Sequence, residues 1–200
     1  MKWIAPTLAY LAIGIGLFVF HSAWGALLGF HFAILISLSI ARPDIPIALL
    51  FKSTNVMWTL VSLLLCGSSG ITLYYAWGVF RFAPDFSAQV ATWGLNKHNW
   101  IPFITYFSLV NPFMEEYFWR GYLGSDVKTL HSTDLIFAGY HIMLLINKLH
   151  VLTIIYAVGL LIAASWLWRQ VKCEDQGLLA AVIGHMAADL TILLAVYLHI

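Results

Sequence analysis

Two adjacent glutamates and an arginine, Glu115, Glu116 and Arg120, interrupt a nearly uncharged part of the chain. Glu116 and Arg120 are four residues apart, so on a helix they share a face and can form an ion pair. Glu115 is rotated by about 100° from Glu116 and can point elsewhere. A buried structural ion pair would account for Glu116 and Arg120 but would leave Glu115 as a lone carboxylate. Because ionisable groups in apolar membrane segments are costly and mark functional sites, we expect this motif to carry chemistry.

Two histidine motifs follow along the chain. FAGYH places His141 one helical turn after Phe137, and HMAAD places His185 and Asp189 on one helix face. Either motif alone is also compatible with a packing histidine or a structural histidine–carboxylate bond. Carboxylates and histidines serve as general acids and bases, and they also bind metals. GxSxG, HExxH and Ser/Lys arrangements are absent from the sequence. The chemistry indicated is activation of water, by glutamate and histidine directly or through a bound metal.

The depth of these groups along their helices favours one shared site. Glu115, His141 and His185 each lie seven to nine residues from a helix end that we expect at the same membrane face. At 1.5 Å per residue, all three lie roughly 10–14 Å below that face. His31 lies in the middle of another apolar stretch without a polar partner at helical spacing other than serines. We therefore assign His31 to the core and the other three groups to a single buried polar site.

The composition is that of an integral membrane protein. Of the 200 residues, 62% are hydrophobic and 10% are charged, and the mean hydropathy is +0.86. Soluble domains carry about 25% charged residues. Backbone in lipid must satisfy its own hydrogen bonds, and the apolar runs do not alternate, so helices are expected rather than a barrel. The net charge of +1 implies no acidic polymer such as nucleic acid as a partner.

The apolar runs predict an all-α, polytopic membrane helix bundle with about seven transmembrane helices, forming a single integral-membrane domain over residues 1–200. The motif-bearing core covers about residues 100–200. Apolar sequence continues to Ile40 without a polar cleavage region, so the first span is expected to be retained. Arg169–Gln176 is predicted to be the most charged loop. The helices are expected at about residues 3–20, 22–40, 57–80, 101–122, 135–147, 151–168 and 177–198.

Lysine and arginine in the loops predict the orientation. With a cytoplasmic N-terminus, six basic residues fall on the inner side and three on the outer side, which agrees with the positive-inside rule. The inner set is Lys2, Arg42, Lys52, Lys128, Arg169 and Lys172, and the outer set is Arg81, Lys97 and Lys148. We expect a multi-pass membrane protein with a cytoplasmic N-terminus.

The order EExxxR, FxxxH and HxxxD, each motif on its own helix, resembles the CPBP family. This family comprises CAAX prenyl endopeptidases and bacteriocin-processing proteins, also described as abortive-infection proteins and glutamic intramembrane proteases. The matching segments are EEYFWRG at Glu115–Gly121, FAGYH at Phe137–His141 and HMAAD at His185–Asp189. The resemblance covers roughly residues 100–200, and the first hundred residues match only in being helical and apolar.

The resemblance implies that Glu115 is the general base and acts with His141 on a water molecule. Glu116 and Arg120 would support the helix and orient Glu115. His185 and Asp189 would stabilise the oxyanion of the tetrahedral intermediate. Well-known CAAX endopeptidases have asparagine where this chain has Asp189, although aspartate also occurs in the family. An ionised aspartate cannot donate a hydrogen bond, so Asp189 would either orient and charge His185 or be protonated by its apolar surroundings. No metal or other cofactor is implied. Because most members of the family are prokaryotic, the resemblance also implies a prokaryotic cell (inner) membrane.

The function expected is that of an intramembrane endopeptidase that hydrolyses a peptide bond near a membrane-associated segment of its substrate. Candidate substrates are a CAAX-like prenylated tail, a leader peptide and a C-terminal sorting signal with its own membrane helix. Two alternatives stay open within this setting: a non-catalytic scaffold or immunity protein of the same family, and a metal-dependent membrane protease. A proton relay or small transporter is disfavoured because the sequence contains no inverted repeat.

Overall fold

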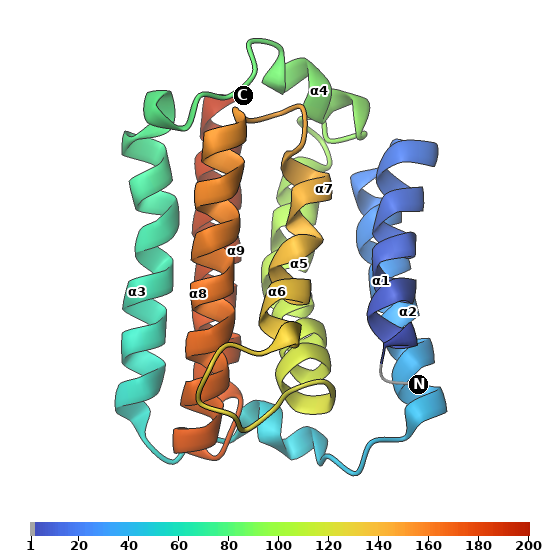
Figure 1. The fold of residues 1–200 in the computed structure, drawn as a ribbon. Helices are drawn as coiled ribbons and strands as arrows, with labels where there is room; N and C mark the ends of the chain where they lie inside the picture. The colour runs from blue at the N-terminus through green and yellow to red at the C-terminus, as the bar shows by residue number, and fades with distance from the viewer. Residues whose placement is uncertain (1–2) are drawn as a thin grey trace.

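The computed structural model describes residues 3–200, which form helices joined by short loops (Figure 1). Helix α1 continues without a break into a π-helical turn at Ile15–Val19, and α5 continues in the same way through Tyr117–Tyr122. Short 3-10 turns occur at Ile47–Phe51 and Trp77–Phe80. The helices are α1 Ile4–Gly14, α2 Ala23–Ala41, α3 Val56–Tyr75, α4 Phe86–Thr92, α5 Trp100–Glu116, α6 Ser132–Gly139, α7 His141–Leu145, α8 Val151–Asp175 and α9 Leu179–His199.

The structure confirms a polytopic helical membrane bundle. Four helices are long and apolar enough to cross a membrane, namely α2, α3, α8 and α9. Two shorter apolar stretches, Ile4–Val19 and Ser132–Leu145, also lie where spans were predicted. The predicted fourth helix corresponds to α5 with its π-helical continuation, which carries the charged motif.

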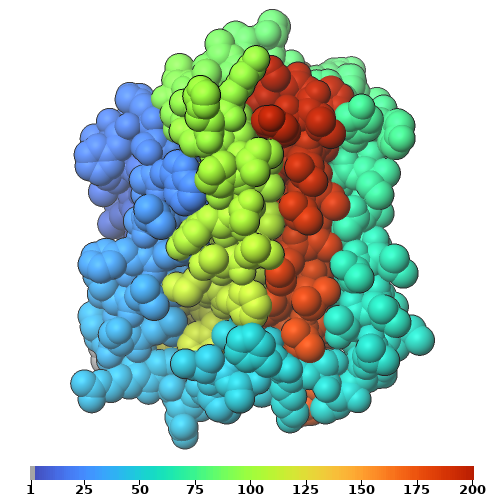
Figure 2. Space-filling view, turned by 180° about the vertical axis from the view of Figure 1, so that it is seen from behind, coloured from blue at the N-terminus to red at the C-terminus, as the bar shows by residue number. Residues whose placement is uncertain are grey.

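Helix α9 is the centre of the packing, because it contacts α3, α5 and α8. On the other side of α5, helices α1 and α2 form a pair, and α2 contacts α5. Seen from behind, α5 and α9 lie side by side, flanked by the α1–α2 pair and by α3 (Figure 2). Helices α5 and α9, which carry two of the motifs, therefore lie between the α1–α2 pair and α3, and α6 packs against α8.

Small residues allow α3 to lie directly against α9, as the sequence Cys66–Gly70 suggests. A Cβ atom added to Gly70 would lie 2.0 Å from the backbone carbon of Thr191. One turn away, a Cβ atom added to Gly67 would lie 3.6 Å from the Cβ of Ala187. In a membrane, where apolar side chains gain little by leaving lipid, such close backbone approach is a principal source of helix association. The α3–α9 contact thus holds the helix that carries the HMAAD motif.

The predicted charged loop at Arg169–Gln176 is wrong, because α8 continues as a helix to Asp175. Arg169 is buried and its guanidinium forms an ion pair of 2.7 Å with Asp134 at the start of α6. The same guanidinium donates hydrogen bonds to the backbone carbonyls of Ser125 and Thr129. The charge of Arg169, which suggested a loop, instead holds the 124–131 loop against α8. This loop joins the first two motifs.

The loops that were predicted to lie on one side of the membrane lie at the same end of the bundle. The 42–55 and 124–131 loops and the α8–α9 turn lie at the lower end of Figure 1, and the 76–99 segment and the C-terminus lie at the upper end. Because Arg169 is buried in an ion pair, it drops out of the basic residues counted at the lower end. Lys2 lies outside the described residues. The cytoplasmic N-terminus stays a prediction.

Candidate active site

Glu115 is a buried carboxylate held by two neutral donors. Its side chain projects from α5, and the residue is 1% exposed. The amide Nδ2 of Asn111, one helical turn earlier, donates to Oε1 at 2.9 Å. The Tyr140 hydroxyl lies 2.7 Å from Oε1 and 2.9 Å from Oε2. An ionised carboxylate has about four acceptor positions. These donors fix the orientation of Glu115 and leave acceptor capacity on Oε2.

Glu116 points to a different part of the bundle and contacts cations. Its Oε1 lies 3.2 Å from Nη1 of Arg120 and 2.8 Å from Nδ1 of His185. The pairing of Glu116 with Arg120 that the four-residue spacing predicts is therefore present, and His185 adds a partner from α9. Consecutive helical residues face directions about 100° apart, which is why the two neighbouring glutamates have separate surroundings.

His185 is held by a stacked ring on one face and by a hydrogen bond at one nitrogen. Trp168 of α8 stacks on the imidazole at 5.0 Å between ring centroids. Nδ1 donates to Glu116, because a carboxylate can only accept. Nε2 lies 3.6 Å from Oδ1 of Asp189, one turn further along α9. This separation is slightly longer than a hydrogen bond, so Asp189 faces the Nε2 edge of the ring without closing on it.

His141 lies at the junction of α6 and α7, where the helix breaks after Gly139. Its Nδ1 lies 3.2 Å from the carbonyl oxygen of Phe137 and must donate to it. In the neutral ring this leaves the lone pair on Nε2, which is the form able to accept a proton. The ring stacks on that of Tyr140 at 4.0 Å. His141 thus stacks on the residue whose hydroxyl binds Glu115.

The ring of Phe137 brings the three motifs together. The Arg120 guanidinium lies 4.0 Å from its centroid. The imidazoles of His141 and His185 lie 5.3 and 6.2 Å from the same centroid. A guanidinium over an aromatic face is attracted by the ring quadrupole, so Phe137 also stabilises the buried cation. The Phe137 ring thus contacts one predicted residue from each motif, namely Arg120, His141 and His185.

Sequence reasoning did not find two donors to Glu115 and misread a third residue. Asn111 lies inside the NPFMEE stretch four residues before Glu115, a spacing that could have identified it. Tyr140 precedes His141 in FAGYH and looks like one more aromatic residue of an apolar helix. His31, which we expected to be core only, is buried but hydrogen-bonded to Asn111 at 3.1 Å. Its partner comes from a different helix, so helical spacing gave no signal for it.

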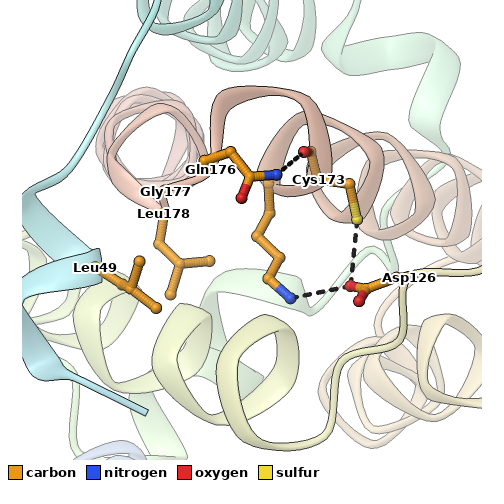
Figure 3. Close-up of a pocket in the computed structure, with 7 residues that line it drawn as sticks. Leu49, Asp126, Cys173, Gln176, Gly177 and Leu178 are labelled. Carbon is orange, nitrogen blue, oxygen red and sulfur yellow. Dashed lines mark hydrogen bonds and ion pairs between the residues drawn. The ribbon is translucent and has the colours of Figure 1, made fainter.

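A separate cavity of about 330 Å³ opens where α8 and α9 meet at the lower end (Figure 3). Leu49 and Leu178 form one wall, and Lys172 pairs with Asp126 at 3.3 Å on the other. Lys172 holds the pKa of the exposed Asp126 carboxyl below its usual range. None of the residues that line this cavity belongs to the three motifs.

Within residues 3–200, no three histidine, cysteine, aspartate or glutamate side chains are grouped so that they could hold a metal ion. The carboxylates and histidines of the site are instead paired with protein partners. Glu115 binds Tyr140 and Asn111, and Glu116 binds Arg120 and His185. The arrangement can provide a proton acceptor at Glu115 or His141 and a donor at His185.

Comparison with known proteins yields one family. Residues 97–191 match the family model described as type II CAAX prenyl endopeptidase, Rce1-like. The match spans all three motifs, from α5 to most of α9. No curated protein and no solved structure matches the chain.

Proposed function

Since residues 97–191 belong to the Rce1-like type II CAAX prenyl endopeptidase family, we propose that this membrane protein is a glutamic intramembrane endopeptidase. It hydrolyses a peptide bond near a membrane-associated segment of a protein or peptide. One observation carries this proposal: two adjacent buried glutamates have different partners. Glu116 is paired with Arg120 and His185, whereas Glu115 receives only neutral donors. One of these donors is Tyr140, whose ring stacks on His141. Glu115 is the carboxylate left free to react.

In the proposed reaction, a water molecule binds between Oε2 of Glu115 and Nε2 of His141. Glu115 accepts a proton from this water as the water oxygen attacks the scissile carbonyl carbon. When the tetrahedral intermediate collapses, the carbon–nitrogen bond breaks and protonated Glu115 returns the proton to the leaving amine. Tyr140 and Asn111 hold the carboxylate so that no reorientation is needed during this step. A positioned general base of this kind typically contributes about 10²–10⁴-fold to the rate.

His185 is assigned to the developing oxyanion, and Asp189 to the orientation of His185. Glu116 holds Nδ1 of His185, so the Nε2 edge is the one that can turn toward substrate. Asp189 lies 3.6 Å from that edge and can accept from it between turnovers. Preorganised donors at an oxyanion are each worth about 10²–10³-fold in rate. Glu116 and Arg120 keep this histidine in place and do not touch substrate.

The substrate is best identified in cells. Strains that express either the wild type or Glu115→Gln are compared by quantitative analysis of protein termini in the membrane fraction. A matched control is Glu174→Gln, because Glu174 is exposed at the end of α8. At least one membrane-associated protein should accumulate uncleaved in Glu115→Gln but not in Glu174→Gln. Identical termini in all three strains would favour a non-catalytic scaffold or immunity role.

Chelation distinguishes the metal-dependent alternative. Purified enzyme in proteoliposomes should cleave the identified substrate at the same rate with and without EDTA. Activity that is lost with EDTA and restored by a divalent metal would overturn the glutamate mechanism. The same experiment with prenylated and unprenylated versions of the peptide tells whether a lipid chain is part of the substrate.

A further inference from the structure

His31 of α2 is a buried titratable residue outside the family match, and the mechanism above does not use it. It is 5% exposed. Its Nδ1 lies 3.2 Å from the hydroxyl of Tyr106, and its Nε2 lies 3.1 Å from Oδ1 of Asn111. Asn111 in turn contacts Glu115 at 2.9 Å. These contacts form a continuous chain from α2 through α5 to the proposed general base.

Hydrogen-bond chemistry fixes the direction of the whole chain. An ionised Glu115 can only accept, so Asn111 must present its NH₂ group to it. The amide oxygen of Asn111 then faces His31 and can only accept, which requires the hydrogen on Nε2. A neutral ring with Nε2 protonated has its lone pair on Nδ1, where it accepts from Tyr106. Every donor therefore points towards Glu115.

We infer that His31 is a positioning residue for Glu115, and this rests on the proposed function of Glu115 as the base. The two ends of an asparagine amide are nearly equal in shape. Without a donor at His31, Asn111 can turn over and present its oxygen to the carboxylate, which replaces an attractive contact by a repulsive one. His31 prevents this because its Nε2–H can only donate. It therefore forms a hydrogen bond only when the amide oxygen of Asn111 faces α2.

Through His31, the first hundred residues contribute to the site. Helices α1 and α2 lie outside residues 97–191. Helix α2 contacts α5, and His31 lies on its buried face next to Phe30 and Ile34. The outer helix pair thus completes the hydrogen bonds of the proposed base, in addition to shielding it from lipid.

Substitutions at His31 separate a donor from a packing role. His31→Gln places an amide N–H near the position of Nε2 and can still donate to Asn111. His31→Leu keeps a similar volume without any donor, and His31→Asn is polar but too short to reach Asn111. Loss of one hydrogen bond in a chain that ends on a charged group corresponds to about a tenfold loss in rate. We expect kcat to fall about tenfold in His31→Leu and His31→Asn at unchanged KM, and His31→Gln to recover most of it.

A second readout needs no substrate. The infrared carbonyl band of the protonated Glu115 carboxyl is identified as the band that Glu115→Gln lacks, and it is followed as a function of pH. Removing a donor disfavours the ionised carboxylate, so the band should persist to higher pH in His31→Leu and His31→Asn. His31→Gln should resemble the wild type. The other titratable or charged groups around Glu115, which are unchanged in every variant, are Tyr140, Arg120, His185 and Asp189.

The outcomes are separable. If His31→Leu and His31→Asn keep the kcat and the infrared titration of the wild type, the inference is wrong. If His31→Gln is as impaired as His31→Leu at equal thermal stability, His31 acts through shape alone and the inference is again wrong. If Glu115→Gln keeps full peptidase activity, the proposed function fails, and the infrared titration still decides whether His31 orders the Glu115 carboxyl. Should His31→Leu not fold, His31→Asn provides the same comparison.

Discussion

The two variants Glu115→Gln and Glu116→Gln should differ strongly in thermal stability. Glu116→Gln removes the charge that compensates Arg120 at 3.2 Å and His185 at 2.8 Å, and all three residues are buried. Breaking a buried ion pair by removing one partner costs roughly 3–5 kcal/mol. At roughly 2–4 °C per kcal/mol for a chain of this size, the unfolding midpoint should fall by roughly 6–20 °C.

Glu115→Gln should be nearly neutral for folding. The glutamine oxygen can keep the hydrogen bond from Tyr140, which spans both carboxylate oxygens at 2.7 and 2.9 Å. The cost is then at most that of one neutral hydrogen bond, about 1 kcal/mol. The assay is thermal unfolding of purified protein in one detergent, followed by intrinsic tryptophan fluorescence. Equal loss of stability in the two variants would refute the division of labour between the glutamates.

Three further outcomes follow from the same contacts. His185→Ala should lower kcat by about 100-fold or more, measured on the purified enzyme, because it removes the proposed oxyanion donor; an unchanged kcat would remove His185 from the mechanism. Asp189→Asn should lower kcat, because Asp189 is assigned to the orientation of His185; an unchanged kcat would indicate that Asp189 acts as a protonated donor instead. Gly70→Ala should destabilise the protein by about 1–3 kcal/mol, since its Cβ would lie 2.0 Å from the Thr191 backbone, whereas Gly159→Ala, with open space around it, should not.

The spans were predictable because lipid imposes a simple rule on the sequence. A helix that must satisfy its own backbone in an apolar solvent shows up as a long apolar run. The predicted helices at 22–40 and 177–198 agree with α2 and α9 to within two residues. The relation of Glu116 to Arg120 was predictable for a similar reason, because both lie on one helix and helical spacing is known in advance.

The failures concern contacts between helices. Arg169 looked like a loop residue because its partner Asp134 lies far away in sequence, and only the fold shows that the two charges neutralise each other. His31 looked like a core residue for the same reason, since Asn111 is in another helix. Tyr140 was missed because its ring fits an apolar helix, whereas its hydroxyl donates to Glu115 on another helix. Helical periodicity cannot reveal any of these contacts.

The most direct test of the account is single-turnover cleavage by purified Glu115→Gln in proteoliposomes that contain EDTA, with Glu174→Gln as the matched control. The substrate is the protein that accumulates uncleaved in the Glu115→Gln strain. We predict wild-type rates for Glu174→Gln, and rates lower by about 10²–10⁴-fold for Glu115→Gln, whose unfolding midpoint falls by no more than about 4 °C. Cleavage by folded Glu115→Gln at the wild-type rate would contradict the account.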